Sequence, residues 1–188
     1  MSSDNSQTLH GSFALRDSFA VPPARVFAAF AEPALRTRWF RLPGRSKTAE
    51  HELDFRVGGG EVSRNVFVFG DVEEFLENRS RFLDIVPDER IVFVYEAKVN
   101  GVLRWTSLVT VELAAQDGGC RLDWTEQYAF LVLTGDGSAD VAHLQGGTRF
   151  LLNGLAAAVE TGTAGLRGGA RLILDGRSAV ADANRQHT

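Results

Sequence analysis

The sequence predicts a single α+β domain in which a meander of antiparallel strands is followed by one long helix. Residues 120–131 alternate apolar and polar side chains with the period of two that is typical of a strand with one buried face. Asn100–Gly101 and Asp117–Gly119 are turn sequences that favour hairpins, and hairpins join antiparallel strands. Residues 139–161 instead repeat their apolar side chains with helical spacing. A chain of 188 residues has the length of one domain.

The N-terminal part predicts one strand and two short helices. Residues 9–19 alternate moderately and are assigned to the first strand. Pro22–Pro23 opens a helix, because proline is tolerated in the first turn. Pro33 then ends this helix and starts a second one, which carries Leu35 and Trp39.

Six more strands are predicted before the long helix. They cover residues from about 47 to 57, then 61–69, 82–86, 91–99, 102–113 and 120–131. The triplet Gly58–Gly60 separates the first two, and the acidic residues 71–74 form a connection or an edge. Pro87–Glu89 has the composition of a type I turn.

The long helix is expected over residues 139–161, with Ser138 as a candidate cap and Gly162 as its stop. Its apolar stripe consists of Val141, Leu144, Leu151, Leu155 and Val159. The domain is therefore predicted to span residues 9–162. Residues 1–8 and 163–188 are interpreted as flexible termini.

Composition excludes several classes of function. The net charge of −4 and the pI of about 5.6 provide no basic excess for a phosphate backbone, so no nucleic-acid partner is expected. Cys120 is the only cysteine, which rules out an intrachain disulfide and a cysteine metal site, and the four histidines lack metal spacing. We expect no metal and no cofactor.

Nothing in the sequence indicates a membrane protein. No run of 18 apolar residues is present, so no membrane span is expected. Residues 1–8 are polar and lack the apolar core of a signal peptide. These features predict a cytoplasmic protein.

Glu126 is the residue best placed for chemistry. The period of two puts it on one strand face with Cys120, Leu122, Trp124, Tyr128 and Phe130, and this face is the apolar one. An unpaired carboxylate there is costly, so we expect Glu126 to point to the interior with a raised pKa, able to bind a ligand donor or move a proton. The alternative is a structural partner for a buried Arg, Tyr or Trp donor, or a residue near solvent at the mouth of a cavity.

Aromatic side chains supply the remaining candidates for a binding site. Trp105 and Trp124 lie on apolar strand faces, where they line a cavity or simply pack in the core. The candidate ligand-binding residues are Trp39, Phe55, Phe67, Phe93, Tyr95, Trp105, Trp124, Glu126, Tyr128, His143 and Leu151.

His143 is a candidate acid/base partner for Glu126 if both side chains face the cavity. It lies on the flank of the helix stripe, so the alternative is a partly exposed helix histidine. No nucleophile motif and no phosphate-binding loop is present, because Gly58–Gly60 lacks the following lysine.

Three segments carry a resemblance to a known family. They are residues 19–40, the sequence Asp-Phe-Arg-Val-Gly-Gly at 54–59, and the sequence Ile-Val-Pro-Asp-Glu-Arg-Ile-Val-Phe at 85–93. In this order they resemble the START/SRPBCC superfamily, and within it the branch named for the C-terminal domain of the activator of the heat-shock-protein ATPase. The resemblance implies a helix-grip fold, in which the sheet curls around the C-terminal helix and encloses a hydrophobic cavity. Relatives commonly carry an aromatic residue after the helix histidine and glycine, where this chain has Gly147–Thr148.

The resemblance implies three alternative functions. The first is a carrier or sensor that binds a small hydrophobic or aromatic molecule in the cavity, without a defined reaction. The second is an enzyme of the polyketide cyclase/aromatase kind that uses Glu126 and His143. The third is a module that interacts with a chaperone ATPase. A homodimer is possible in each case, and the balance of features favours a protein that is not an enzyme.

Overall fold

The computed structural model describes residues 8–160 and 170–177, with side chains described as far as Ile173 in the second range. Its strands are β1 (Leu9–Phe19), β2 (Glu50–Leu53), β3 (Gly60–Phe69), β4 (Val72–Val86), β5 (Arg90–Val99), β6 (Val102–Gln116), β7 (Gly119–Phe130) and β8 (Arg171–Arg177). Its helices are α1 (Pro23–Ala31), α2 (Pro33–Trp39), the short 3₁₀ helix η1 (Ser46–Thr48) and α3 (Ser138–Val159).

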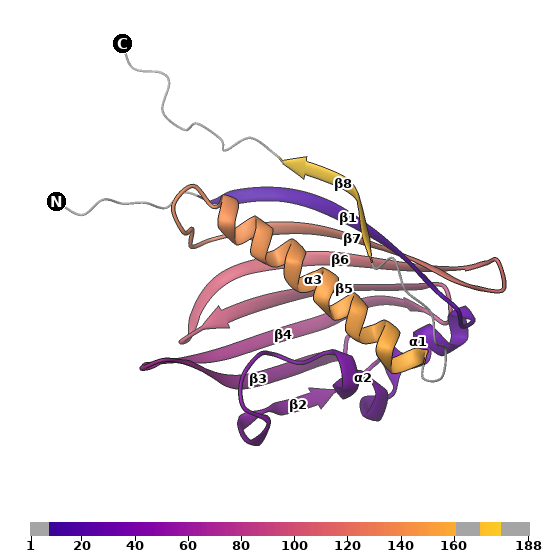
Figure 1. The fold of residues 1–188 in the computed structure, drawn as a ribbon, viewed down its shortest axis with the longest axis horizontal. Helices are drawn as coiled ribbons and strands as arrows, with labels where there is room; N and C mark the ends of the chain where they lie inside the picture. The colour runs from indigo at the N-terminus through magenta and orange to yellow at the C-terminus, as the bar shows by residue number, and fades with distance from the viewer. Residues whose placement is uncertain (1–7, 161–169, 178–188) are drawn as a thin grey trace, which may run out of the picture.

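All eight strands form one antiparallel sheet in the order β2-β3-β4-β5-β6-β7-β1-β8. The sheet curves around α3, which crosses its concave face, while α1 and α2 lie at one end of that helix (Figure 1). The predicted α+β, helix-grip architecture is confirmed.

Tight turns whose central residues have positive φ connect neighbouring strands of the meander. Asn100 and Gly101 have φ values of 53° and 78°, and Asp117 and Gly118 have values of 50° and 77°. Positive φ at both central residues matches the twist of a two-residue hairpin. Both predicted hairpins, β5–β6 and β6–β7, are confirmed.

One face of α3 packs into the core, and it differs slightly from the predicted stripe. Val141, Leu144, Leu155 and Val159 are buried as expected. Leu151 is only partly buried, whereas Leu152 is 0% exposed. Thr148 and Leu152 continue the series of steps of three and four residues, so the true stripe passes through them.

Two strand boundaries differ from the prediction. The acidic residues 71–74 were expected to form a connection or an edge, but β4, which lies between β3 and β5, begins at Val72 and runs without a break to Val86. Its outward side chains are charged and form ion pairs, such as Glu77 with Arg64 on β3 and with Lys98 on β5, so apolar alternation is missing there. Phe55 was assigned to a strand, yet β2 already ends at Leu53.

Residues 54–59 form a turn instead of a strand. The exposed side chains of Arg56 and Asp54 pair across it, with Nε and Oδ2 2.9 Å apart. Gly59 lies so close to the backbone oxygen of Asp54 that a Cβ atom would clash with it. The glycines following Val57 are therefore required by a tight turn.

The C-terminal segment is not entirely the loose tail that we predicted. Residues 171–177 form β8, which pairs with β1 along the open edge of the sheet. An unpaired strand edge offers free backbone groups, and the apolar cluster at 172–174 belongs to the segment that pairs with them. The remaining predicted termini, residues 1–7, 163–169 and 178–188, lie outside the described part.

Candidate ligand site on the concave face

Strand register aligns side chains into rows on the concave face. Directly paired residues on neighbouring strands share a face. One row contains Phe13, Glu126, Val109, Phe93 and Phe82, from β1 to β4. The next row, which we call the polar row, contains Tyr128, Ser107, Tyr95, Ser80 and Glu61, from β7 to β3. The polar row, with its hydroxyl groups, therefore lies beside a row in which Glu126 is the one polar residue.

Glu126 lies at the junction of these rows and is 0% exposed. Tyr95 donates its hydroxyl proton to Oε1 at 2.6 Å, and Trp124 donates from Nε1 to Oε2 at 3.0 Å. The Thr148 hydroxyl on α3 lies 3.4 Å from Oε2 and 3.1 Å from the backbone oxygen of Leu144, between which it shares its single proton. Trp105 Nε1 donates to the Tyr95 oxygen at 3.1 Å. Four elements, β5, β6, β7 and α3, therefore meet at one carboxyl group.

Burial dominates the electrostatics of this group. It raises the pKa of Glu126, and hydrogen bonds from Tyr95, Trp124 and Thr148, together with the nearby Ser107 hydroxyl, offset only part of the effect. Burial, followed by the charge of Glu126, also raises the pKa of Tyr95 well above its ordinary value. Within residues 8–160, no Lys, Arg or His side chain forms an ion pair with Glu126.

The predicted interior position of Glu126 is confirmed, and its burial acts in the expected direction on its pKa. Complete burial excludes the alternative of a residue near solvent. The alternative of a structural partner is realised in part, because Tyr and Trp donors do bind the carboxyl group. A carboxyl group in this setting can hold a proton closer to neutral pH, and can therefore donate as well as accept.

We expect Glu126→Gln to flatten one part of the pH profile of stability. A folded-state pKa raised above the ordinary value near 4.5 means that the folded protein binds this proton more tightly than the unfolded chain does. The stabilisation that comes from this tighter proton binding is complete below pH 4.5 and is lost as pH rises through the folded-state pKa of Glu126. The wild type should therefore lose stability relative to the variant as pH rises above 4.5, as measured by urea unfolding. A constant difference between the two proteins at all pH values would show that Glu126 titrates normally.

Aromatic rings surround the carboxyl group in a continuous series. Phe27 contacts Phe55 at a centroid distance of 5.6 Å, Phe55 contacts Phe82 at 4.9 Å, and Phe82 contacts Phe93 at 6.1 Å. Phe93 contacts Trp124 at 5.8 Å. On the other side, Phe130 contacts both Trp105 and Tyr128. Of the predicted residues, the structure brings Phe93, Tyr95, Trp105, Trp124 and Tyr128 together with Glu126, and Phe55 joins them through Phe82.

Four predicted residues lie elsewhere, namely Trp39, Phe67, Leu151 and His143. Trp39 packs between Phe30 and Phe40, and its Nε1 donates to the backbone oxygen of Ala29, so it belongs to the helix end of the core. Phe67 and Leu151 are partly exposed.

The predicted pairing of His143 with Glu126 is wrong. His143 is exposed on α3, because it directly precedes the buried Leu144 and so points about 100° away around the helix. Thr148, rather than His143, is the α3 residue that reaches Glu126. Sequence reasoning did not single out Thr148, which directly follows the Gly146–Gly147 pair.

A second buried charged cluster was not predicted. Arg36 on α2 donates to Glu61 on β3 through Nε at 2.7 Å and Nη2 at 2.6 Å, and both residues are buried. His51 Nε2 lies 2.7 Å from Glu61 Oε1. The guanidinium also lies over the rings of Trp39 and Phe40, at 4.3 Å and 4.1 Å. Sequence could not reveal this cluster, because its three charged members lie on separate elements.

The two buried acids differ electrostatically. Burial by itself would raise the pKa of Glu61, but Arg36 and then His51 more than offset it, and the pKa is lowered. Glu61 is thus a charge held by a cation, while Glu126 is an acid without one. Only the second arrangement leaves a buried carboxyl group whose pKa is raised, because burial is not offset by a cation among the described residues.

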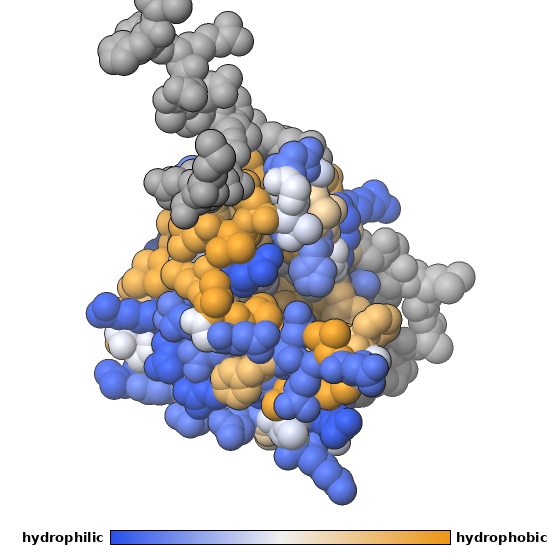
Figure 2. Space-filling view, turned by 90° about the vertical axis from the view of Figure 1, so that its left-hand side faces the viewer, coloured by the Kyte–Doolittle hydropathy of each residue, from blue (hydrophilic) through white to orange (hydrophobic). Residues whose placement is uncertain are grey.

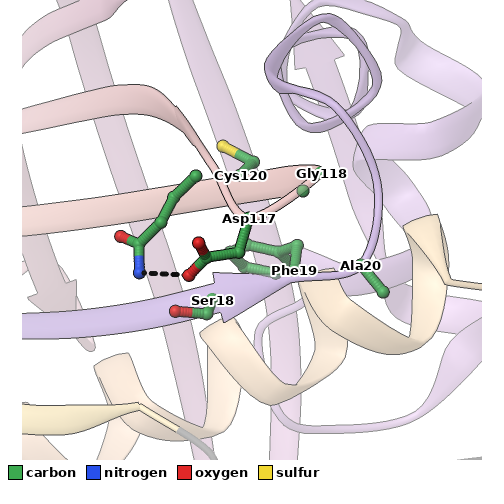
Figure 3. Close-up of a pocket in the computed structure, with 8 residues that line it drawn as sticks. Ser18, Phe19, Ala20, Asp117, Gly118 and Cys120 are labelled. Carbon is green, nitrogen blue, oxygen red and sulfur yellow. Dashed lines mark hydrogen bonds between the residues drawn. The ribbon is translucent and has the colours of Figure 1, made fainter.

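A surface pocket of about 370 Å³ lies at the β6–β7 turn (Figure 3). Its lining includes Ser18, Phe19, Asp117 and Cys120, and Gln116 donates to Asp117 across it. It contains none of the predicted ligand-binding residues, and Cys120 lies six residues along β7 from Glu126, roughly 20 Å at the rise of a strand. Burial raises the pKa of the Cys120 thiol to about 11, so this thiol stays protonated.

Within the described ranges, no group of three or more His, Cys, Asp or Glu side chains is arranged to hold a metal ion. The described helices likewise include none that is long and apolar enough to span a membrane.

A match to a protein-family model identifies the family of this chain. The family model described as "Activator of Hsp90 ATPase homolog 1-like protein" matches residues 20–160. The chain belongs to this family. The match covers both short helices, β2 to β7 and α3, and it ends where α3 ends.

Several solved structures share the fold of this chain. A Rhizobium leguminosarum protein is 32% identical with a TM-score of 0.72, over 82% of this chain and 97% of that chain. The Mll3558 protein of Rhizobium loti is 43% identical with a TM-score of 0.68, over 80% and 98%. DynU16, a protein in the dynemicin biosynthetic locus, shares the fold alone, at 20% identity and a TM-score of 0.55 over 81% of this chain and 48% of that chain. No curated protein matches the sequence.

Proposed function

We propose that this protein binds a small hydrophobic or aromatic molecule between α3 and the concave face of the sheet, as a carrier or sensor. One observation carries the proposal. The buried Glu126 is held by neutral donors from Tyr95 and Trp124, without a cation among the described residues, on a face lined by aromatic rings. Ligand sites combine such apolar walls with a few convergent polar groups.

The end of the sheet that carries the β3–β4 and β5–β6 turns is the proposed entrance. Trp105 and Tyr95 are partly exposed, although they contact the buried Glu126 network. Figure 2 views the molecule from this end and shows hydrophobic side chains gathered between hydrophilic ones. Exposed apolar residues there include Phe69 and Val102. Apolar surface at this end would favour the first contact with an apolar ligand.

The other two functions have less support. An enzyme of the cyclase kind would need a second acid/base group beside Glu126, and His143 does not supply it. Tyr95 touches Glu126, but its pKa is raised well above the ordinary value, so the phenol stays protonated and no phenolate is available to act as a base. A role with a chaperone ATPase rests on the family description alone. A cytoplasmic location and a homodimer remain parts of the proposal.

Calorimetry and thermal unfolding with 2-ethylnaphthalene test the binding function. A ligand at 100 times its Kd adds about 2.7 kcal/mol of stability, and each kcal/mol raises the Tm of a chain of this size by about 2–4 °C. We therefore expect a rise of roughly 5–10 °C at that saturation. Trp105→Ala should weaken binding at least fivefold, whereas Phe69→Ala, which removes a ring that is 77% exposed, should not.

Absence of both binding heat and a Tm shift near saturation would overturn the carrier or sensor function. Turnover of a bound compound that Glu126→Gln abolishes, with binding intact, would establish an enzyme in its place. Stimulation of a chaperone ATPase without any binding of small molecules would favour the third function.

A further inference from the structure

We infer that the ligand carries an oxygen acceptor, such as a carbonyl group, which the polar row binds through the hydroxyl groups of Ser80 and Ser107. This inference rests on the proposed function and specifies the chemical class of the molecule. The ligand is then a flat aromatic carbonyl compound rather than a hydrocarbon.

The first support is a pair of buried hydroxyl groups without partners. Ser80 and Ser107 are 8% and 3% exposed. Neither Oγ atom has a hydrogen-bond partner of acceptable geometry in the described part of the chain. Buried polar side chains are normally paired, so an unpaired one indicates a water or a ligand that completes the site.

The second support is their position. Ser80 on β4 and Ser107 on β6 are each directly paired with Tyr95 on β5, so the two serines flank the tyrosine on the same face. Neighbouring strands lie about 4.8 Å apart, which places both serines within about one strand spacing of Tyr95. An oxygen atom in front of Tyr95 would be reachable from either side.

The third support is the balance of donors and acceptors. The Tyr95 proton is committed to Glu126, and the Tyr95 oxygen already accepts from Trp105. Ser107 is close enough to lower the pKa of both Glu126 and Tyr95, but those groups are already engaged with other donors. At the β3 end of the row, Arg36 Nη1 is buried and also lacks a partner, and a guanidinium can only donate. The serine hydroxyls can donate or accept and the Arg36 nitrogen can only donate, so a ligand that supplies acceptors is compatible with all three unpaired groups.

Two probes of nearly equal shape test this inference. 2-Acetylnaphthalene carries a carbonyl oxygen, and 2-isopropenylnaphthalene has a CH₂ group in its place. We expect Ser80→Ala/Ser107→Ala to weaken binding of the ketone about tenfold and to leave binding of the alkene unchanged, because one hydrogen bond accounts for roughly that factor. Ser63→Ala is the matched control, since Ser63 is also buried on the concave face but lies outside the polar row.

The possible outcomes distinguish a failure of this inference from a failure of the proposed binding function. If the double variant weakens both probes equally or neither, the hydroxyl groups serve water or the fold, and the inference is overturned while the binding function stands. If neither probe binds the wild type, the proposed function itself fails. Thermal unfolding of each variant confirms that it is folded before titration.

Discussion

Arg36→Ala is expected to lower the free energy of unfolding by about 3–5 kcal/mol, the usual cost of breaking one half of a buried ion pair. The guanidinium makes two hydrogen bonds to Glu61 and lies against Trp39 and Phe40. Its removal leaves Glu61 buried with only His51 beside it. Urea unfolding measures the loss, and the Tm should fall by roughly 10 °C in parallel.

Arg56→Ala is the matched control, because Arg56 pairs with Asp54 in solvent and exposed pairs contribute little. A second comparison is Arg36→Met/Glu61→Leu, which removes both charges and should recover much of the stability that Arg36→Ala loses. Equal effects of Arg36→Ala and Arg56→Ala would mean that the Arg36–Glu61 pair is not held in the interior.

The acid limb of the stability profile provides a further readout of the same variant. The pKa of Glu61 is lowered in the folded protein, so its stabilisation is present above the ordinary value near 4.5 and is lost as pH falls through the folded-state pKa. Arg36→Ala should therefore flatten the profile below about pH 4.5. This is the opposite of the window in which Glu126→Gln acts.

Leu152→Ala is expected to destabilise the protein by about 2–5 kcal/mol, the range for truncating a buried leucine. Leu152 is 0% exposed at the centre of the α3 face that meets the sheet. Its methyl groups leave a cavity when removed, because the surrounding rings and strands relax only in part. Chemical unfolding of the variant and the wild type gives the difference.

Two neighbouring substitutions show which face of α3 is buried. Phe150→Ala removes a ring that is 75% exposed and should leave stability unchanged, although phenylalanine is the larger residue. The stability loss for Leu151→Ala should lie between those for Phe150→Ala and Leu152→Ala, since Leu151 is only partly buried. A larger loss for Leu151 than for Leu152 would restore the stripe expected from the sequence and contradict the rotation of the helix in the structure.

Local patterns were sufficient for most of the fold. Asn100–Gly101 and Asp117–Gly119 could be recognised as hairpin turns because few residues adopt positive φ without strain. The strand around Glu126 could be recognised because one of its faces is apolar throughout. Prediction failed at β4 and β8, where outward ion pairs and a sheet edge, rather than alternation, stabilise the strands.

The sequence by itself determined that Glu126 is interior, because the period of a strand depends only on neighbouring residues. Only the tertiary structure decided which groups meet it. Strand register brought Tyr95, Ser107 and Ser80 into one row, and the rotation of α3 selected Thr148 over His143. Arg36 and Glu61 likewise came together from α2 and β3. Contacts between separate elements depend on how those elements pack, and no local pattern in the chain encodes that arrangement.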